Sequence, residues 1–149
     1  MSPYQRLLHN NIIWISLLAW FIAQVLKVIF SLIVNKKLDI RRFIGAGGMP
    51  SSHSALVVSL ATSIGRIEGY DSSLFALAAT FSLIVMYDAA GVRRAAGKQA
   101  AVLNEIVQQI QDHKGVSEEK LKELLGHTPI EVIAGALLGF VISRLFFGL

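Results

Sequence analysis

Two histidines occupy the same kind of position in this sequence, where a polar loop runs into an apolar segment. His53 follows the glycine- and serine-rich stretch 45–52, and His127 lies between Gly126 and Thr128. A helix that begins at such a junction presents unpaired N–H groups and the positive end of its dipole, both of which hold phosphate well. A histidine at the same place can serve as nucleophile or general acid in the chemistry of a phosphate ester.

Simple helix capping competes with this interpretation at both junctions. Serine is a common N-cap, so Ser51 and Ser52 need no catalytic role, and glycines before them are typical of a loop. At the second junction Thr128 resembles an N-cap, Pro129 a first helical residue and Glu131 the end of a capping box. Capping leaves His127 unexplained. The convergence of two positive helix ends, each with a histidine, is the strongest argument from the residues for an anion site.

Charged residues in or beside the apolar segments are further candidates. Lys27 lies about two turns inside the first segment, where a charge is costly and therefore indicates function, although it could also snorkel to the membrane surface. Asp88 ends the third segment, and Arg93 and Arg94 follow it. A salt bridge from Asp88 to Arg93 or Lys27 is the structural alternative to a catalytic role.

The elements that must position these residues are membrane helices. The 149 residues are 54% hydrophobic and 16% charged, which is unusual for a soluble domain. Apolar runs at 11–34, 72–87 and 129–147 are long enough to cross a hydrocarbon core of about 30 Å. A fourth run, 54–67, is short and would cross only with tilt, local thinning or a snorkelling Arg66. We therefore expect an all-α membrane bundle of about four spans.

The distribution of basic residues orients this bundle. If all four runs span, segments 35–50 and 89–128 share one face, and ten lysines and arginines lie there: Lys36, Lys37, Arg41, Arg42, Arg93, Arg94, Lys98, Lys114, Lys120 and Lys122. The positive-inside rule makes this face cytoplasmic and places both termini outside. The first run lacks the order of a signal peptide and is interpreted as a retained anchor. Nucleic-acid binding is disfavoured, because the charges flank apolar runs and form no basic domain.

One membrane-embedded domain, 1–149, is expected, with a cytoplasmic helical insertion at about 93–126. From 93 to 110 the apolar residues recur near helical spacing, which predicts an amphipathic helix on the bundle or the lipid surface. Residues 112–115 interrupt it, and a second short helix is expected from Ser117 to a stop at Gly126. Gly135 and Gly139 form a small-residue spacing that predicts close helix packing, within the chain or between chains.

Three blocks of sequence together resemble the divergent PAP2 family, a membrane group related to type 2 phosphatidic acid phosphatases and vanadium-dependent haloperoxidases. The blocks are GMPSSHS at 48–54, VMYDAAGVR at 85–93 and GHTP at 126–129 followed by Gly139. The resemblance covers nearly the whole chain, from about 24 to 139. The order of the three blocks makes it specific, whereas Pro-Ser-x-His alone is weak.

The resemblance implies a role for each candidate residue. Lys27 would take the place of the lysine in the first motif of the superfamily, Ser51, Ser52 and His53 the second motif, and Arg93, His127 and Glu131 the third. Ser52 stands where the superfamily has glycine, and Glu131 where it has aspartate. The arginine-proline end of the first motif is missing. More than thirty residues separate Arg93 from His127 in place of five, which leaves open whether Arg93 or Arg94 faces the site.

The implied activity is hydrolysis of a lipid phosphomonoester at the cytoplasmic face through a phosphohistidine, without metal or other cofactor. Phosphatidylglycerophosphate is the implied substrate, with phosphatidic acid and polyprenyl phosphates or diphosphates as alternatives. A haloperoxidase that holds vanadate and a non-enzymatic lipid transporter or scaffold are the rivals from other classes. The expected partners are the bilayer and the lipid, with no nucleic acid. A homodimer remains open, because four helices are few to enclose such a site.

Overall fold

Helices account for nearly all of the described structure. The computed structural model describes residues 2–36, 48–111 and 126–146, with no strand in these ranges. The helices are α1 (Pro3–Leu8), α2 (Asn11–Asn35), α3 (Ser52–Glu68), α4 (Ser73–Ala90), α5 (Val92–Gln111) and α6 (Pro129–Phe146). The predicted all-α class is confirmed.

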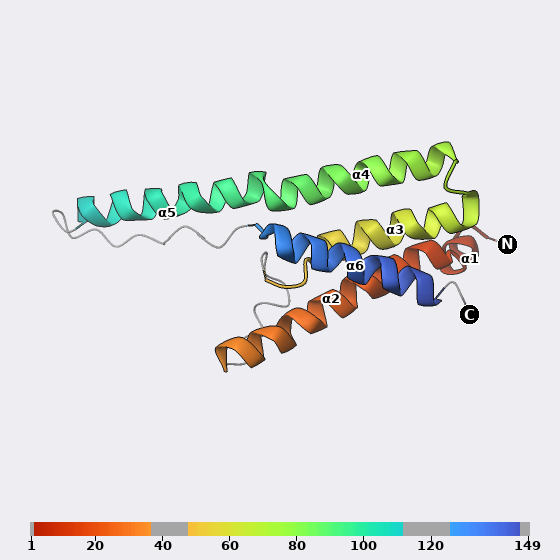
Figure 1. The fold of residues 1–149 in the computed structure, drawn as a ribbon, viewed down its shortest axis with the longest axis horizontal. Coiled ribbons are helices and arrows are strands. Elements are labelled where there is room, and N and C mark those ends of the chain that lie inside the picture. The colour runs from red at the N-terminus through yellow and green to blue at the C-terminus, as the bar shows by residue number, and fades with distance from the viewer. Residues whose placement is uncertain (1, 37–47, 112–125, 147–149) are drawn as a thin grey trace.

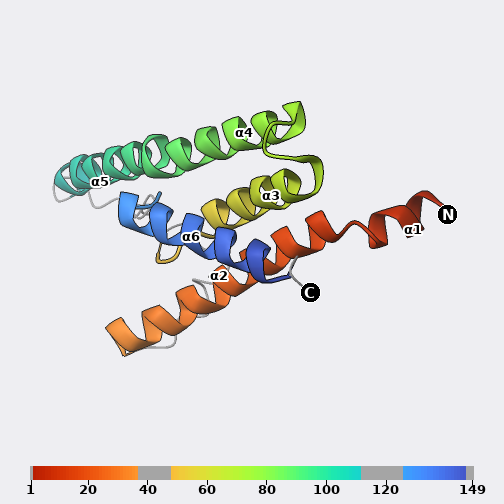
Figure 2. The same cartoon turned by 45° about the vertical axis from the view of Figure 1, so that its right-hand side comes forward.

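Four of these helices form the bundle, with α3 at its centre. Helix α3 packs against α6, α2 and α4, and Figure 1 shows the four helices running in alternating directions. The start of α1, the end of α6 and the α3–α4 connection lie at one end of the bundle in Figures 1 and 2. The starts of α3 and α6 and the end of α4 therefore lie at the other end. This is the alternation of segments that four spans require.

Polar side chains cap the starts of these helices. The side chain of Asn10 accepts the backbone N–H of Ile13 at α2, and that of Ser72 accepts the N–H of Phe75 at α4. Ser51 accepts the N–H of Ser54 at α3. Each cap satisfies one of the N–H groups that a helix leaves unpaired in its first turn. Capping thus fixes where each bundle helix begins, including the helix that carries His53.

Helix α3 differs from its neighbours in composition. Three stretches of the described chain are long and apolar enough to cross a membrane, namely Asn11–Val34, Ser73–Gln108 and Pro129–Phe146. Helix α3 is not among them, because it has only 17 residues and buries serine and threonine, including Ser59, Thr62 and Ser63. At 1.5 Å per residue it measures about 25 Å. Its neighbours shield it from lipid, so it needs no continuous apolar surface.

Glycines bring α6 onto α3. A Cβ atom on Gly135 would lie 2.2 Å from the carbonyl oxygen of Ser51, and one on Gly139 would lie 2.3 Å from that of Ala55. Only glycine fits at both positions, and the spacing of four residues places them on one face of α6. The hydroxyls of Ser63 and Ser143 hydrogen bond across the same interface at 2.9 Å. The predicted close packing occurs within the chain.

The amphipathic helix predicted from residue 93 is present as α5. In both views it continues the direction of α4 and extends past the start of α6 (Figures 1 and 2). Its main contacts among the described helices are with α4, so it does not lie along the bundle. The second short helix, expected from Ser117, lies outside the described residues, as do the lysines and arginines at 37–42.

Candidate active site

Three helix ends meet around the two histidines. The backbone N–H of Ser51, the N-cap of α3, donates to the carbonyl of Glu131 in the first turn of α6 at 2.9 Å. The N–H of His127 donates to the carbonyl of Ala89 near the end of α4, also at 2.9 Å. These bonds bring the rings of His53 and His127 to a centroid distance of 6.1 Å, with their planes at 66°.

Glu131 holds the imidazole of His127. Its Oε2 atom lies 2.9 Å from His127 Nδ1 and also accepts the N–H of Thr128 at 3.2 Å. The N–H of Glu131 donates to the Thr128 hydroxyl at 3.4 Å, so the predicted capping box is present. An ionised carboxylate only accepts, which assigns the proton to Nδ1 and the lone pair of a neutral ring to Nε2.

The Nε2 atom of His127 is buried and has no hydrogen-bond partner among the described residues. The residue is 2% exposed. Burial is the largest influence on its imidazole and lowers the pKa below the ordinary 6.5. The hydrogen bond and charge of Glu131 raise this pKa and the positive charge of Lys27 lowers it. The backbone of Gly48, which approaches the ring without forming a hydrogen bond of ordinary geometry, also raises it. The net lowering favours a neutral ring with a lone pair at Nε2.

Lys27 reaches this site from α2. Its side chain is 2% exposed, so it does not snorkel to the surface. Gly48, at φ +91°, lies against it, since a Cβ there would be 3.0 Å from Lys27 Cγ. The left-handed backbone favours glycine at position 48, and any larger residue there would also press on the side chain of Lys27. Because the charge of Lys27 acts on His127, the ammonium group and the imidazole share one site.

The serines at the start of α3 are buried beside His53. Ser51 and Ser54 are fully buried and Ser52 is 2% exposed. The hydroxyl of Ser54 donates to the hydroxyl oxygen of Ser51 at 3.1 Å. The first turn of α3 therefore offers backbone N–H groups and hydroxyls at a buried positive helix end, which suits an anion. His53 itself is half-buried at the second position of this helix.

The structure ties the remaining candidate residues less closely to the two histidines. Asp88 is half-buried at the end of α4, one residue before the Ala89 carbonyl that holds His127. Arg93 and Arg94 belong to the first turn of α5, but their side chains lie outside the described part. No group of three or more His, Asp or Glu side chains in the described ranges could hold a metal ion.

Sequence reasoning missed Gln24. This residue is 5% exposed on α2, and its Oε1 atom has no hydrogen-bond partner in the described part of the chain. It precedes Lys27 by three residues and so lies on the same face of the helix. A polar amide within an apolar run, one turn from a lysine, was the available signal.

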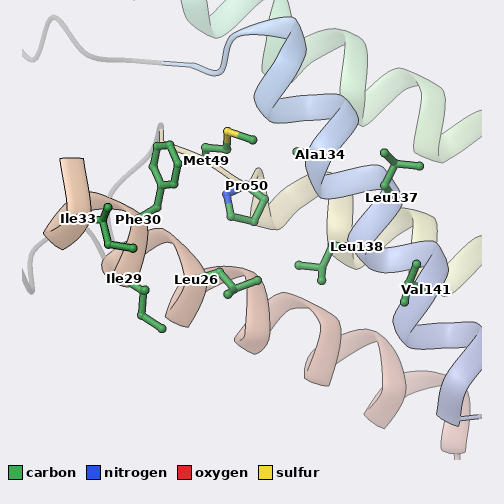
Figure 3. A pocket seen from close by; sticks show the side chains of 10 residues that line it. All are labelled: Leu26, Ile29, Phe30, Ile33, Met49, Pro50, Ala134, Leu137, Leu138 and Val141. Carbon is green, nitrogen blue, oxygen red and sulfur yellow. The ribbon is translucent and has the colours of Figure 1, made fainter.

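An apolar groove of about 520 Å³ lies beside the site, between α2 and α6 (Figure 3). Every lining residue is apolar. Helix α2 contributes Leu26, Ile29, Phe30 and Ile33, the loop before α3 contributes Met49 and Pro50, and α6 contributes Ala134, Leu137, Leu138 and Val141. Several of these side chains are exposed in the isolated chain, among them Ile33 and Leu137. The groove is thus open on the outer side of the bundle.

The arrangement of the three blocks agrees with a comparison against known families. The model of the divergent PAP2 family matches residues 8–142. The chain belongs to this family. The resemblance inferred from the three blocks is confirmed, and this divergent PAP2 protein is a membrane protein.

A relative of this divergent PAP2 protein agrees with that placement. The chain is 47% identical to the Uncharacterized membrane protein YuiD of Bacillus subtilis (strain 168), over 93% of this chain and 94% of that protein. No solved structure matches the chain. Family membership and the apolar helices together establish a PAP2-like membrane protein, whose activity must be argued from the site.

Proposed function

We propose that this divergent PAP2 protein is a lipid phosphatase that hydrolyses a phosphomonoester at the cytoplasmic face of the membrane. The observation that carries the proposal is the state of His127. Its ring is buried, its Nδ1 atom is paired with Glu131, and its Nε2 atom has no partner in the described chain. A neutral imidazole held in one tautomer with a buried lone pair is equipped for nucleophilic attack.

In the proposed first step Nε2 of His127 attacks phosphorus, and an N–P bond forms as the P–O bond to the lipid breaks. His53 gives its proton to the leaving alkoxide. Glu131 stabilises the positive charge that develops on the His127 ring. The ring centroids lie 6.1 Å apart, so both histidines are close enough to act on the same phosphate group.

Water completes the proposed cycle. His53, now neutral, takes a proton from a water molecule whose oxygen attacks phosphorus. The N–P bond breaks, inorganic phosphate leaves and His127 is restored. Lys27, the Ser51 hydroxyl, Ser52 and the N–H groups of α3 would stabilise the phosphoryl oxygens, joined by Arg93 or Arg94. Asp88 is a further candidate that would position the end of α4.

Phosphatidylglycerophosphate is the proposed substrate, with phosphatidic acid and polyprenyl phosphates or diphosphates as alternatives. The experiment measures phosphate release by purified protein from each of these lipids in mixed micelles without added metal. The variants are His53→Ala and His127→Ala, and the control is His9→Ala. His9 is exposed at the end of α1 and far from the site in sequence.

We expect release from one lipid, abolished by His127→Ala, reduced about 10²–10⁴-fold by His53→Ala and unchanged by His9→Ala. A phosphoenzyme that is labile in acid and stable in base should form in wild type but not in His127→Ala. Folded protein that releases phosphate from none of the lipids would overturn the phosphatase and favour a transporter or scaffold. Retained turnover in His127→Ala would exclude it as the nucleophile.

A further inference from the structure

The groove between α2 and α6 is joined to the proposed phosphate site through shared segments. Pro50 lines the groove, and the next residue, Ser51, is the buried cap of α3 that binds the Glu131 carbonyl. Leu26 lines the groove, and the next residue is Lys27. Ala134 lies one turn beyond Glu131 on α6. A ligand with its phosphate beside His127 thus has the groove directly next to its remaining part.

The chemistry of the groove restricts what can occupy it. Its lining offers no charged side chain and no amide or hydroxyl group, so a polar ligand would lose its hydrogen bonds to water without replacement. In a membrane protein the outer face of α2 and α6 is surrounded by hydrocarbon. Figure 3 shows Met49 and Pro50 between the two helices, and Leu26 and Leu138 facing the space from opposite sides. The lining of the groove therefore favours an aliphatic chain as its occupant.

The size and shape of the groove agree with such a chain. At about 520 Å³ it has room for a long aliphatic chain. Because it is open on the outer side of the bundle, the far end of the chain can continue into the surrounding lipid. We propose that the groove holds one acyl chain of a diacylglycerophospholipid whose phosphomonoester lies at His127. This inference rests on the proposed function and specifies its substrate class.

The groove would act by positioning its ligand. A chain that moves from bilayer to groove exchanges one apolar surrounding for another, so hydrophobic free energy changes little. An acyl chain held in the groove fixes the position of the lipid backbone relative to the histidines. This matters because small displacements of a reacting group lower the reaction rate. Filling the groove should therefore slow turnover of a lipid but leave a small phosphate ester without a chain unaffected.

The kinetic experiment compares Leu137→Trp with Ile133→Trp. Both residues are on the exposed side of α6, at 62% and 59% exposure, but only Leu137 lines the groove. We expect Leu137→Trp to lower kcat/KM for a dioleoyl phosphomonoester lipid about tenfold and to leave p-nitrophenyl phosphate hydrolysis unchanged. Ile133→Trp should change neither. Equal loss on both substrates, or no loss on the lipid, would overturn the groove assignment.

A binding experiment is independent of turnover. Phosphatidic acid with a diazirine near the end of one acyl chain is photolysed with the protein in detergent, and the labelled peptides are mapped. Labelling should concentrate on Leu26 to Ile33 and on Ala134 to Val141, and excess unlabelled phosphatidic acid should suppress it. Uniform labelling of all bundle helices, or equal suppression by polyprenyl phosphate, would overturn the acyl-chain assignment. Saturable labelling without hydrolysis of any substrate would retain the groove and refute the phosphatase.

Discussion

Burial and the carboxylate of Glu131 shift the pKa of His127 in opposite directions. Burial lowers the pKa of its imidazole, whereas the hydrogen bond and charge of Glu131 raise it. The balance keeps the ring neutral at neutral pH while the carboxylate fixes which nitrogen carries the proton. For a nucleophilic histidine both conditions are necessary, since a protonated ring has no lone pair and the other tautomer would direct its lone pair at Glu131.

The pH dependence of activity should reflect this balance. In the proposed mechanism His127 must be neutral to attack phosphorus, and its pKa lies below 6.5. Because a lowered pKa means that the ring stays neutral to lower pH, the acid limb of kcat/KM for a lipid phosphomonoester should fall below pH 6.5. A pH profile of purified protein from pH 4 to 9 measures it. An acid limb above pH 7 would contradict the assignment.

Replacement of Glu131 by glutamine separates its two effects. The variant loses the negative charge that raises the pKa of His127, so the acid limb should move to lower pH than in wild type. It also loses the charge that stabilises the ring during attack, and kcat should fall about 10²–10⁴-fold. The control is Glu68→Gln at the opposite end of α3, which should alter neither quantity. A Glu131→Gln profile shifted to higher pH would refute this role.

Gly48 tests whether the placement of Lys27 matters. In Gly48→Ala the new Cβ would lie 3.0 Å from Lys27 Cγ at a backbone φ of +91°, so the lysine must move. We expect kcat/KM to fall about 10–100-fold. Lys27→Met should remove activity to at least the same extent, because the methionine fills the space without the charge. Full activity in Gly48→Ala would show that the position of Lys27 has no influence on turnover.

At the level of elements, the α3–α6 interface sets the positions of the two histidines relative to each other. Gly135 faces the carbonyl of Ser51 and Gly139 that of Ala55, so the glycine face of α6 rests directly on the backbone of α3. The same interface carries the bond from Ser51 N–H to Glu131. The distance between the two helix starts is thus set by glycines about two and three turns into α6.

Gly139→Ala should destabilise the protein. Alanine normally favours a helix over glycine by about 1 kcal/mol, but here its Cβ would lie 2.3 Å from the Ala55 carbonyl. The helices must separate, and we expect a net loss of about 1–3 kcal/mol, measured by thermal unfolding in detergent. Val141→Ile adds a methylene on the groove side of the same helix and should change the unfolding temperature little. Unchanged stability in Gly139→Ala would contradict the contact.

Sequence patterns predicted the apolar helices better than the central one. Helices α2, α4 and α6 face lipid and need continuous apolar surface, which hydropathy detects. Helix α3 contacts protein on three sides, so Ser59, Ser63 and other small polar residues suffice there, and its run of 54–67 was the weakest of the four. The capping box at Thr128 was predictable because capping is local. The hydrogen bond from His127 to the Ala89 carbonyl was not, because backbone contacts between distant segments leave no pattern.

At the scale of the whole molecule, alternating helix directions place the site at the end opposite to both described chain ends (Figure 1). The sequence predicted this alternation from four apolar runs, and it predicted the facing side from the lysines and arginines. The arrangement of helices supports the predicted alternation. The cytoplasmic placement of the basic face stays a prediction, as does the homodimer, because neither follows from the packing of one chain.

The absence of cysteine from the sequence makes the orientation directly testable. Single cysteines replace Ser2, near the start, and Gln99, on α5, both of which are exposed. A membrane-impermeant maleimide should label Ser2→Cys in intact cells and Gln99→Cys only after permeabilisation, because the basic face is predicted to be cytoplasmic. The cysteine-free parent measures background. The reverse pattern would place the proposed site on the outer side.

The central position of α3 also has a consequence for biogenesis. A helix with so many buried hydroxyls is a poor candidate for stable insertion into lipid by itself, and it is made before two of the three helices that shield it. Its largest contact is with α6, the last bundle helix to be synthesised. The helix that completes the shielding also brings His127 and Glu131. Partly synthesised chains should therefore be unstable in the membrane and should also lack the proposed catalytic centre.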